Sequence, residues 1–229
     1  MKKILLVASL IAFSQAVSAH TGLLPTGGFS HGFQHPFLGL DHFLVMLGLG
    51  LWASGQFRQL AKQAIGVFLL FMTAGALLGL NGFGFAYVET AILVSLLLVG
   101  MALSFGIAPI VPTLRRGNSV RNAPALRRDA GASDTAFPFM PQRVRRSVGT
   151  IITLASIAFF AAMHGLAHGS EIPVDASAYA YIAGIVSATA VLHCSGLVLG
   201  LSAQRINAGG LIRVYGTLTG LTGAWLLFA

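Results

Sequence analysis

Residues 63–80 read QAIGVFLLFMTAGALLGL, a run of eighteen positions without one charged side chain. As a helix rising 1.5 Å per residue it spans about 27 Å, close to the ~30 Å hydrocarbon core of a bilayer. The chain as a whole is 55% hydrophobic and 9% charged over 229 residues. Because charged residues make up roughly a quarter of a typical soluble domain, this composition excludes a soluble enzyme. Five further apolar stretches fall near 36–55, 84–107, 148–169, 177–202 and 209–229.

These apolar runs are continuous rather than alternating, which disfavours a membrane β-barrel. Unpaired backbone groups are costly in lipid, so each run is expected to be helical. The fold class predicted is therefore an all-α polytopic membrane protein with six transmembrane helices. Those helices form one membrane domain over residues 36–229.

The N-terminus has the features of a targeting segment. Lys2 and Lys3 form a positive region, residues 4–13 are apolar, and Val17 and Ala19 occupy the small-residue positions of a cleavage site. This pattern predicts a signal peptide over residues 1–19 that is cleaved. The mature chain then begins outside the membrane at His20, in an external histidine-containing segment, residues 20–35.

Basic residues outside the signal peptide occur in three places. Arg58 and Lys62 lie between the first and second spans, eight arginines lie in residues 113–147, and Arg205 and Arg213 flank the last short gap. By the positive-inside rule all three places are cytoplasmic, which puts both mature termini outside. The Arg-rich loop 113–147 is interpreted as a flexible linker that fixes topology and touches anionic lipid, so no nucleic-acid partner is expected.

Three acidic residues fall at or inside the predicted spans: Asp41, Glu89 and Glu171. An ionisable group there costs several kcal/mol unless it is paired or ligated, so each indicates function. Asp41 stands beside His42, seven residues after His35. If the first helix begins at Pro36, these two histidines share a helical face.

A second block contains His164, His168 and Glu171 at i, i+4 and i+7, one stripe at the outer end of the fourth span. Gly165 and Gly169 form a small-xxx-small pair within it, which lets another helix approach closely. We expect this pair to bring the first span near the fourth.

Under the topology set by Lys and Arg, all these groups lie on the external side. Imidazole and carboxylate without thiolate suit Ni²⁺, Co²⁺, Zn²⁺, Cu²⁺ or Mn²⁺. The alternative is a buried hydrogen-bond network that only packs helices. His193 lies deeper, next to Cys194, and either role is open for it. The candidate metal ligands are His20, His31, His35, Asp41, His42, Glu89, His164, His168 and Glu171.

Two blocks carry a family resemblance. The first runs from His35 through Asp41 and His42 into Met46, Gly48 and Trp52, and the second, HGLAHGSE, runs from His164 to Glu171. With the signal peptide and six spans, they resemble the HupE/UreJ family of bacterial nickel and cobalt permeases. The resemblance implies a multi-pass protein of the bacterial inner membrane that takes up metal for nickel enzymes or cobalt needs. By motif, it places functional roles on His35, Asp41, His42, His164, His168 and Glu171, and by position on Glu89.

The function predicted is secondary uptake of a divalent transition-metal ion, Ni²⁺ or Co²⁺ ahead of Zn²⁺, by a protein that is not an enzyme. The sequence has no G-x-x-x-x-G-K-[ST] loop for nucleotide. The ion is cargo, and no prosthetic group is expected. Partners are the ion, the bilayer and a cytoplasmic metallochaperone. A homo-oligomer is left open, because a glycine-rich face in the last span suits either tight packing or a subunit interface. The alternatives are an intramembrane metal-dependent hydrolase and a metal-binding sensor or assembly subunit.

Overall fold

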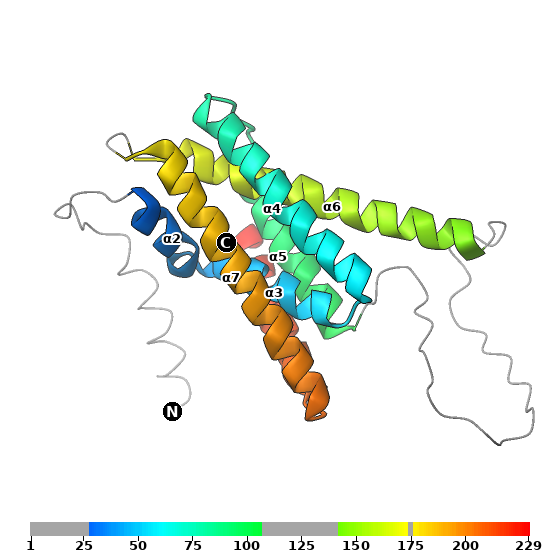
Figure 1. Ribbon diagram of the computed structural model, residues 1–229. Helices are drawn as coiled ribbons and strands as arrows, with labels where there is room; N and C mark the ends of the chain where they lie inside the picture. The colour runs from blue at the N-terminus through cyan, green and yellow to red at the C-terminus, as the bar shows by residue number, and fades with distance from the viewer. Residues whose placement is uncertain (1–27, 107–141, 174–175) are drawn as a thin grey trace, which may run out of the picture.

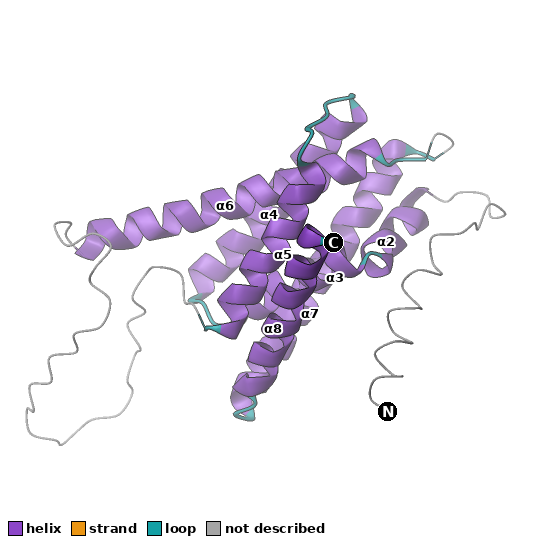
Figure 2. Cartoon of the chain, turned by 180° about the vertical axis from the view of Figure 1, so that it is seen from behind, coloured by secondary structure: helices purple, strands orange, loops and turns teal. Residues whose placement is uncertain are grey.

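The computed structural model describes residues 28–106, 142–173 and 176–229 of the chain (Figure 1). The predicted signal peptide 1–19, His20 and most of the loop 113–147 lie outside them. Within the described ranges the chain is helical, without a strand (Figure 2). The helices are α2 (Gly28–Leu38), α3 (Leu40–Ser54), α4 (Arg58–Leu80), α5 (Val88–Ser104), α6 (Gln142–Ser170), α7 (Ala178–Arg205) and α8 (Gly209–Phe228).

Each of the six predicted apolar stretches carries a helix. Four segments are long and apolar enough to cross a bilayer alone: α4, residues 148–170 of α6, α7 and α8. The pair α2 and α3 makes a fifth if it counts as one broken span, and α5, with 17 residues, is a shorter apolar helix. The protein is therefore a multi-pass helical membrane protein with four or five candidate spans in its described part, and a sixth crossing by α5 stays a prediction.

Glycines set how closely the helices pack. A methyl group added at a glycine in each of the four main helix pairs would press on backbone or glycine atoms of the partner helix. In lipid, such small residues allow the backbone contact that holds helices together. The facing pairs are Gly32–Gly184 for α2 and α7, Gly50–Gly196 for α3 and α7, Gly79–Gly169 for α4 and α6, and Gly100–Gly220 for α5 and α8.

Gly165 and Gly169 do pack against another helix, but it is α4 rather than the first span: they meet Met72 and Ala76. The expectation that they bring α3 to α6 was wrong, because a small-xxx-small pattern specifies closeness and not the partner. The glycine-rich face of α8, in contrast, packs inside the chain, where Gly216 and Gly220 meet α5.

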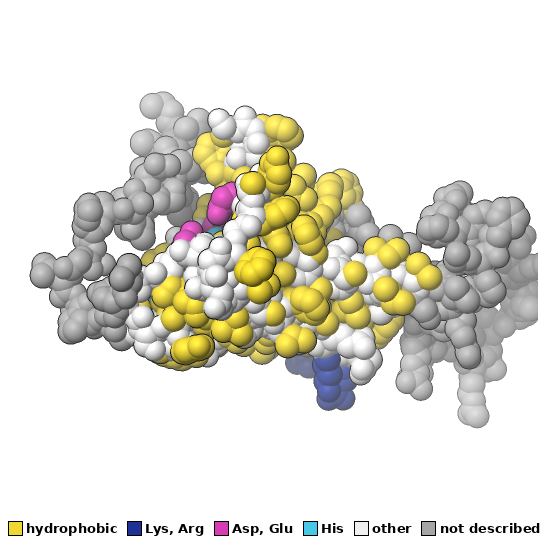
Figure 3. Space-filling model, turned by 90° about the horizontal axis from the view of Figure 1, so that it is seen from above, with side chains coloured by type: hydrophobic (Ala, Val, Ile, Leu, Met, Phe, Trp, Pro, Cys, Tyr) yellow, Lys and Arg dark blue, Asp and Glu magenta, His cyan; other side chains and the backbone are white. Residues whose placement is uncertain are grey.

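Acidic and basic residues lie at opposite ends of the helix bundle. The glycine contacts make α4 run parallel to α6, and α3 parallel to α7. The end of α6 with His168 and Glu171 is thus remote from the helix ends that carry the described basic residues, Arg58, Lys62, Arg205 and Arg213. Figure 3 shows acidic side chains in a recess of one face and Lys and Arg at the opposite edge.

The first span breaks at Gly39, where the chain bends by 83° between α2 and α3. Gly39 has an extended backbone (φ −86°, ψ 115°) and caps α3. Pro36 precedes it inside α2 and lacks the N–H that would continue the helical ladder. A single helix starting at Pro36, with His35 and His42 on one face, was therefore a wrong prediction.

Candidate metal centre

The centre lies where three helix ends meet. His35 is in the last turn of α2, Asp41 and His42 are in the first turn of α3, and His168 is in the last turn of α6. The free N–H groups at the start of α3 favour a negative charge, which suits the Asp41 carboxylate. The two sequence blocks are thus brought together by the break at Gly39 and by the packing of α6.

Four imidazole rings form a continuous cluster in this space. The ring of His168 lies with its centroid 4.8 Å from that of His35 and 4.6 Å from that of His42. His42 is also 5.4 Å from His164 and 6.1 Å from His35. Two histidines from each sequence block therefore surround one region.

Hydrogen bonds orient two of these rings in the same way. The Nδ1 of His42 lies 2.9 Å from Asp41 Oδ1, and the Nδ1 of His164 lies 2.8 Å from the Phe160 carbonyl oxygen. Carboxylate and carbonyl oxygens only accept, so in both rings Nδ1 carries the hydrogen and Nε2 keeps a lone pair. Both Nε2 atoms are buried, with no hydrogen-bond partner among the residues that the structure describes. This is the arrangement by which proteins prepare histidine to ligate a metal.

In His168 both ring nitrogens are buried, and within the described ranges neither has a hydrogen-bond partner. A buried polar atom left unsatisfied costs about 1–3 kcal/mol. A cluster made only for helix packing would satisfy these atoms. The open lone pairs therefore favour a ligand-binding role for the cluster over the packing network.

His35, His168 and Glu171 form the group best placed to hold one ion, with a ligand atom from each lying within 4.8 Å of the others. The Nε2 of His35 is 3.6 Å from Glu171 Oε2. Ligands about 2.1 Å from a central ion are at most about 4.2 Å apart, so a small side-chain rotation closes the group. One carboxylate with two imidazoles suits a divalent transition metal.

Exposure falls steadily from the surface into the cluster. The exposed fraction is 52% for the Glu171 side chain, 31% for His35 and 12% for His42, and it is zero for His164 and His168. Partial burial raises the pKa of the Glu171 carboxyl above its ordinary value, and the nearby negative charge of Glu89 raises it further. The arrangement provides an entrance at Glu171 and buried imidazoles behind it.

The other predicted ligands lie at the margin or outside. Glu89, in the first turn of α5, is exposed, and its interaction with Glu171 is electrostatic repulsion between the two carboxylates. His31 is exposed on α2, with its ring 6.2 Å from that of Tyr181. Neither belongs to the group that closes on one ion, and His20 lies outside the described residues.

Sequence reasoning missed Tyr181 and the backbone oxygens. The Tyr181 hydroxyl lies 3.1 Å from His35 Nδ1 and thereby orients that ring from α7. A tyrosine inside an apolar span carries no motif that marks it. The Phe160 carbonyl is a backbone group, so no residue type signals its role.

The comparisons with known proteins confirm the family resemblance. The family described as HupE / UreJ protein matches residues 7–116 and 142–226 of this chain. The chain belongs to the HupE/UreJ family. Among its relatives, Protein HupE of Rhizobium leguminosarum bv. viciae is 30% identical over 227 residues, which cover 98% of this chain and 97% of that protein. No solved structure matches this HupE/UreJ protein.

Proposed function

We propose that this protein is a secondary permease that takes up Ni²⁺ or Co²⁺ through the cluster at the end of α6. The observation that carries the proposal is the set of open lone pairs. The rings of His42, His164 and His168 are close together, and their buried Nε2 atoms have no hydrogen-bond partner among residues 28–106, 142–173 and 176–229. Membership of the HupE/UreJ family supports it, because the family resemblance implies nickel and cobalt transport.

The charge distribution supports an inward direction of transport. Arg58, Lys62, Arg205 and Arg213 lie at the helix ends remote from the cluster, and the positive-inside rule assigns such ends to the cytoplasm. The cluster then opens to the outside. The membrane potential, negative inside, draws a divalent cation toward the basic end.

The mechanism follows the gradient of burial. Glu171 and His35 collect the hydrated ion, and their carboxylate and imidazole replace part of its water shell. His42, His168 and His164 take the ion over as the remaining water is lost. The Asp41 carboxylate accepts the hydrogen bond from Nδ1 of His42, and its negative charge offsets the positive charge of an ion at that ring. Imidazole ligands favour Ni²⁺ and Co²⁺ over Mg²⁺ and Ca²⁺, which prefer oxygen shells.

The test is metal accumulation in a bacterial host that lacks its own nickel and cobalt transporters. Cells expressing the wild type, His42→Ala or the control Gln34→Ala are given low concentrations of Ni²⁺, Co²⁺, Zn²⁺ or Mn²⁺. Gln34 is exposed and precedes His35 in the chain, so Gln34→Ala controls for the loss of a polar side chain near the centre. We expect accumulation of Ni²⁺ or Co²⁺ with wild type and Gln34→Ala and at least a tenfold loss with His42→Ala. Wild-type protein that reaches the membrane and binds metal but gives no accumulation refutes the permease.

A further inference from the structure

His193 is a fully buried histidine that lies outside the four-ring cluster. It lies on α7, fully buried, with Nδ1 2.6 Å from the carbonyl oxygen of Met46 on α3. As at His42 and His164, the acceptor is an oxygen, so Nδ1 carries the hydrogen and Nε2 keeps the lone pair. That Nε2 is buried and has no hydrogen-bond partner in the described part of the chain. His193 therefore shares with His42 and His164 a hydrogen-bonded Nδ1 and an open Nε2 lone pair, although it lies outside both sequence blocks.

Phe68 of α4 contacts both His193 and a histidine of the cluster. Its ring centroid lies 4.8 Å from that of His193 and 5.9 Å from that of His164, and the residue is buried. The phenyl ring thus contacts both His164 of the cluster and His193. An ion that passes Phe68 on its way between these two imidazoles would displace an apolar ring.

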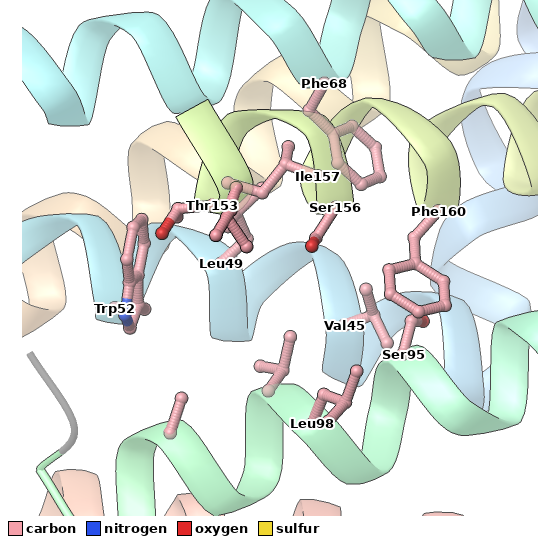
Figure 4. Close-up of a pocket in the computed structure, with 13 residues that line it drawn as sticks. Val45, Leu49, Trp52, Phe68, Ser95, Leu98, Thr153, Ser156, Ile157 and Phe160 are labelled. Carbon is pink, nitrogen blue, oxygen red and sulfur yellow. The ribbon is translucent and has the colours of Figure 1, made fainter. Parts of the chain in front are cut away.

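The structure provides room for that displacement. Phe68 lines a cavity of about 280 Å³ between α3, α5 and α6, whose walls are almost entirely apolar. Figure 4 shows Phe68 at the α4 side of this cavity, with Ile157 and Phe160 beside it. The cavity is large enough to take a phenyl ring. Rotation of Phe68 into it would withdraw the ring from His164 and His193.

Two thioether sulfurs lie next to Thr189, one turn of α7 from His193. Thr189 is one turn earlier on the same face of α7, and its hydroxyl is 3.2 Å from Met46 Sδ and 3.6 Å from Met72 Sδ. One hydroxyl hydrogen serves one sulfur at a time, so a thioether is always free. Imidazole and thioether together suit late first-row metals and reject Mg²⁺. These donors are all neutral, which favours brief residence of a divalent ion over storage.

We propose that His193 is a second, inner binding station for the transported ion, closed off from the outer cluster by the ring of Phe68. The inference rests on the proposed transport function. It adds a residue outside both sequence blocks and a gate that makes the two stations separately accessible.

The experiment combines uptake with metal binding. Ni²⁺ and Co²⁺ accumulation is measured in cells, and the affinity of the outer cluster is measured by titration of purified protein with the same ions. For His193→Ala we expect at least a tenfold loss of uptake with outer-cluster affinity changed less than threefold. Cys194→Ala is the matched control, because Cys194 is the exposed neighbour of His193, and it should leave both readouts unchanged.

Two outcomes overturn the inference. His193→Ala that transports within tenfold of the wild type shows that the ion does not need this residue, and loss of outer-cluster binding in that variant shows a structural role. If the His193→Ala protein does not reach the membrane, His193→Cys provides a second test. A thiolate at an inner station should raise uptake of Cd²⁺ relative to Ni²⁺ at least tenfold, and an unchanged ratio contradicts the station. Failure of the proposed function is recognised separately, since then the wild type itself gives no uptake.

Discussion

Gly165 offers a direct test of how packing positions the cluster. It lies on α6 between His164 and His168, against α4. A methyl group added there overlaps the Met72 carbonyl oxygen and lies 2.8 Å from Ala76 N, whereas ordinary contact begins near 3.4 Å. The difference is 0.6 Å, and because backbone atoms cannot rotate away, α6 must retreat by at least this much in Gly165→Ala. Overpacking of this kind costs about 1–3 kcal/mol.

The same shift should impair metal binding. Ligand distances in a metal site are held to within about 0.2 Å, so moving the histidines of α6 by 0.6 Å exceeds the tolerance threefold. We expect Gly165→Ala to lower the melting temperature in detergent by about 2–12 °C, at roughly 2–4 °C per kcal/mol, and to weaken Ni²⁺ binding at least tenfold.

The matched control is Gly66→Ala on α4, where an added methyl group meets nothing within 4 Å. This variant should melt at or slightly above the wild-type temperature, since alanine gains up to about 1 kcal/mol of helix propensity, and should bind Ni²⁺ normally. Thermal unfolding and metal titration are run on the wild type and both variants together. If Gly165→Ala matches Gly66→Ala in both measurements, the close approach of α6 to α4 does not hold the cluster in place.

Three further predictions concern individual side chains of the centre. Asp41→Asn should weaken Ni²⁺ binding about 10–100-fold in the same titration, because the carboxylate that accepts from His42 is lost; a change below threefold would contradict its supporting role. Tyr181→Phe removes the hydroxyl next to His35 Nδ1 and should cost about 1 kcal/mol of metal affinity, roughly fivefold, with no change in expression. The raised pKa of Glu171 means that protons compete for this carboxylate at a higher pH than for an ordinary glutamate. Metal binding by the wild type should therefore weaken as pH falls through that range, and Glu171→Gln, which binds less at every pH, should show a flatter decline; parallel pH curves would exclude Glu171 as a ligand.

Residue type made part of the centre predictable. In a chain with 9% charged residues, an Asp or Glu within an apolar run is conspicuous, and so is a histidine beside it. Spacing within one helix also held for His164 and His168, whose rings both face His42. These inferences need only the period of a helix and the cost of a charge in lipid.

Contacts between helices were not predictable in the same way. Gly169 signals a close neighbour, yet only the fold determines that the neighbour is Ala76 of α4. The carbonyl oxygens of Phe160 and Met46 orient His164 and His193, but every residue has a carbonyl group, so the sequence cannot single them out. The role of His193 was open for this reason.

The break at Gly39 explains how the first block makes a site at all. His35 and His42 are seven residues apart in the sequence, which corresponds to about 10.5 Å along the axis of an unbroken helix. Two ligands of one ion, in contrast, lie at most about 4.2 Å apart. The 83° bend instead brings their rings to a centroid distance of 6.1 Å. Gly39 also leaves space inside the bend, because a methyl group there would lie 3.1 Å from His42 Nδ1 and 3.2 Å from Asp41 Oδ1. The ligand geometry of this block therefore depends on the loss of helical continuity, and the same residues on a straight span would not converge on an ion.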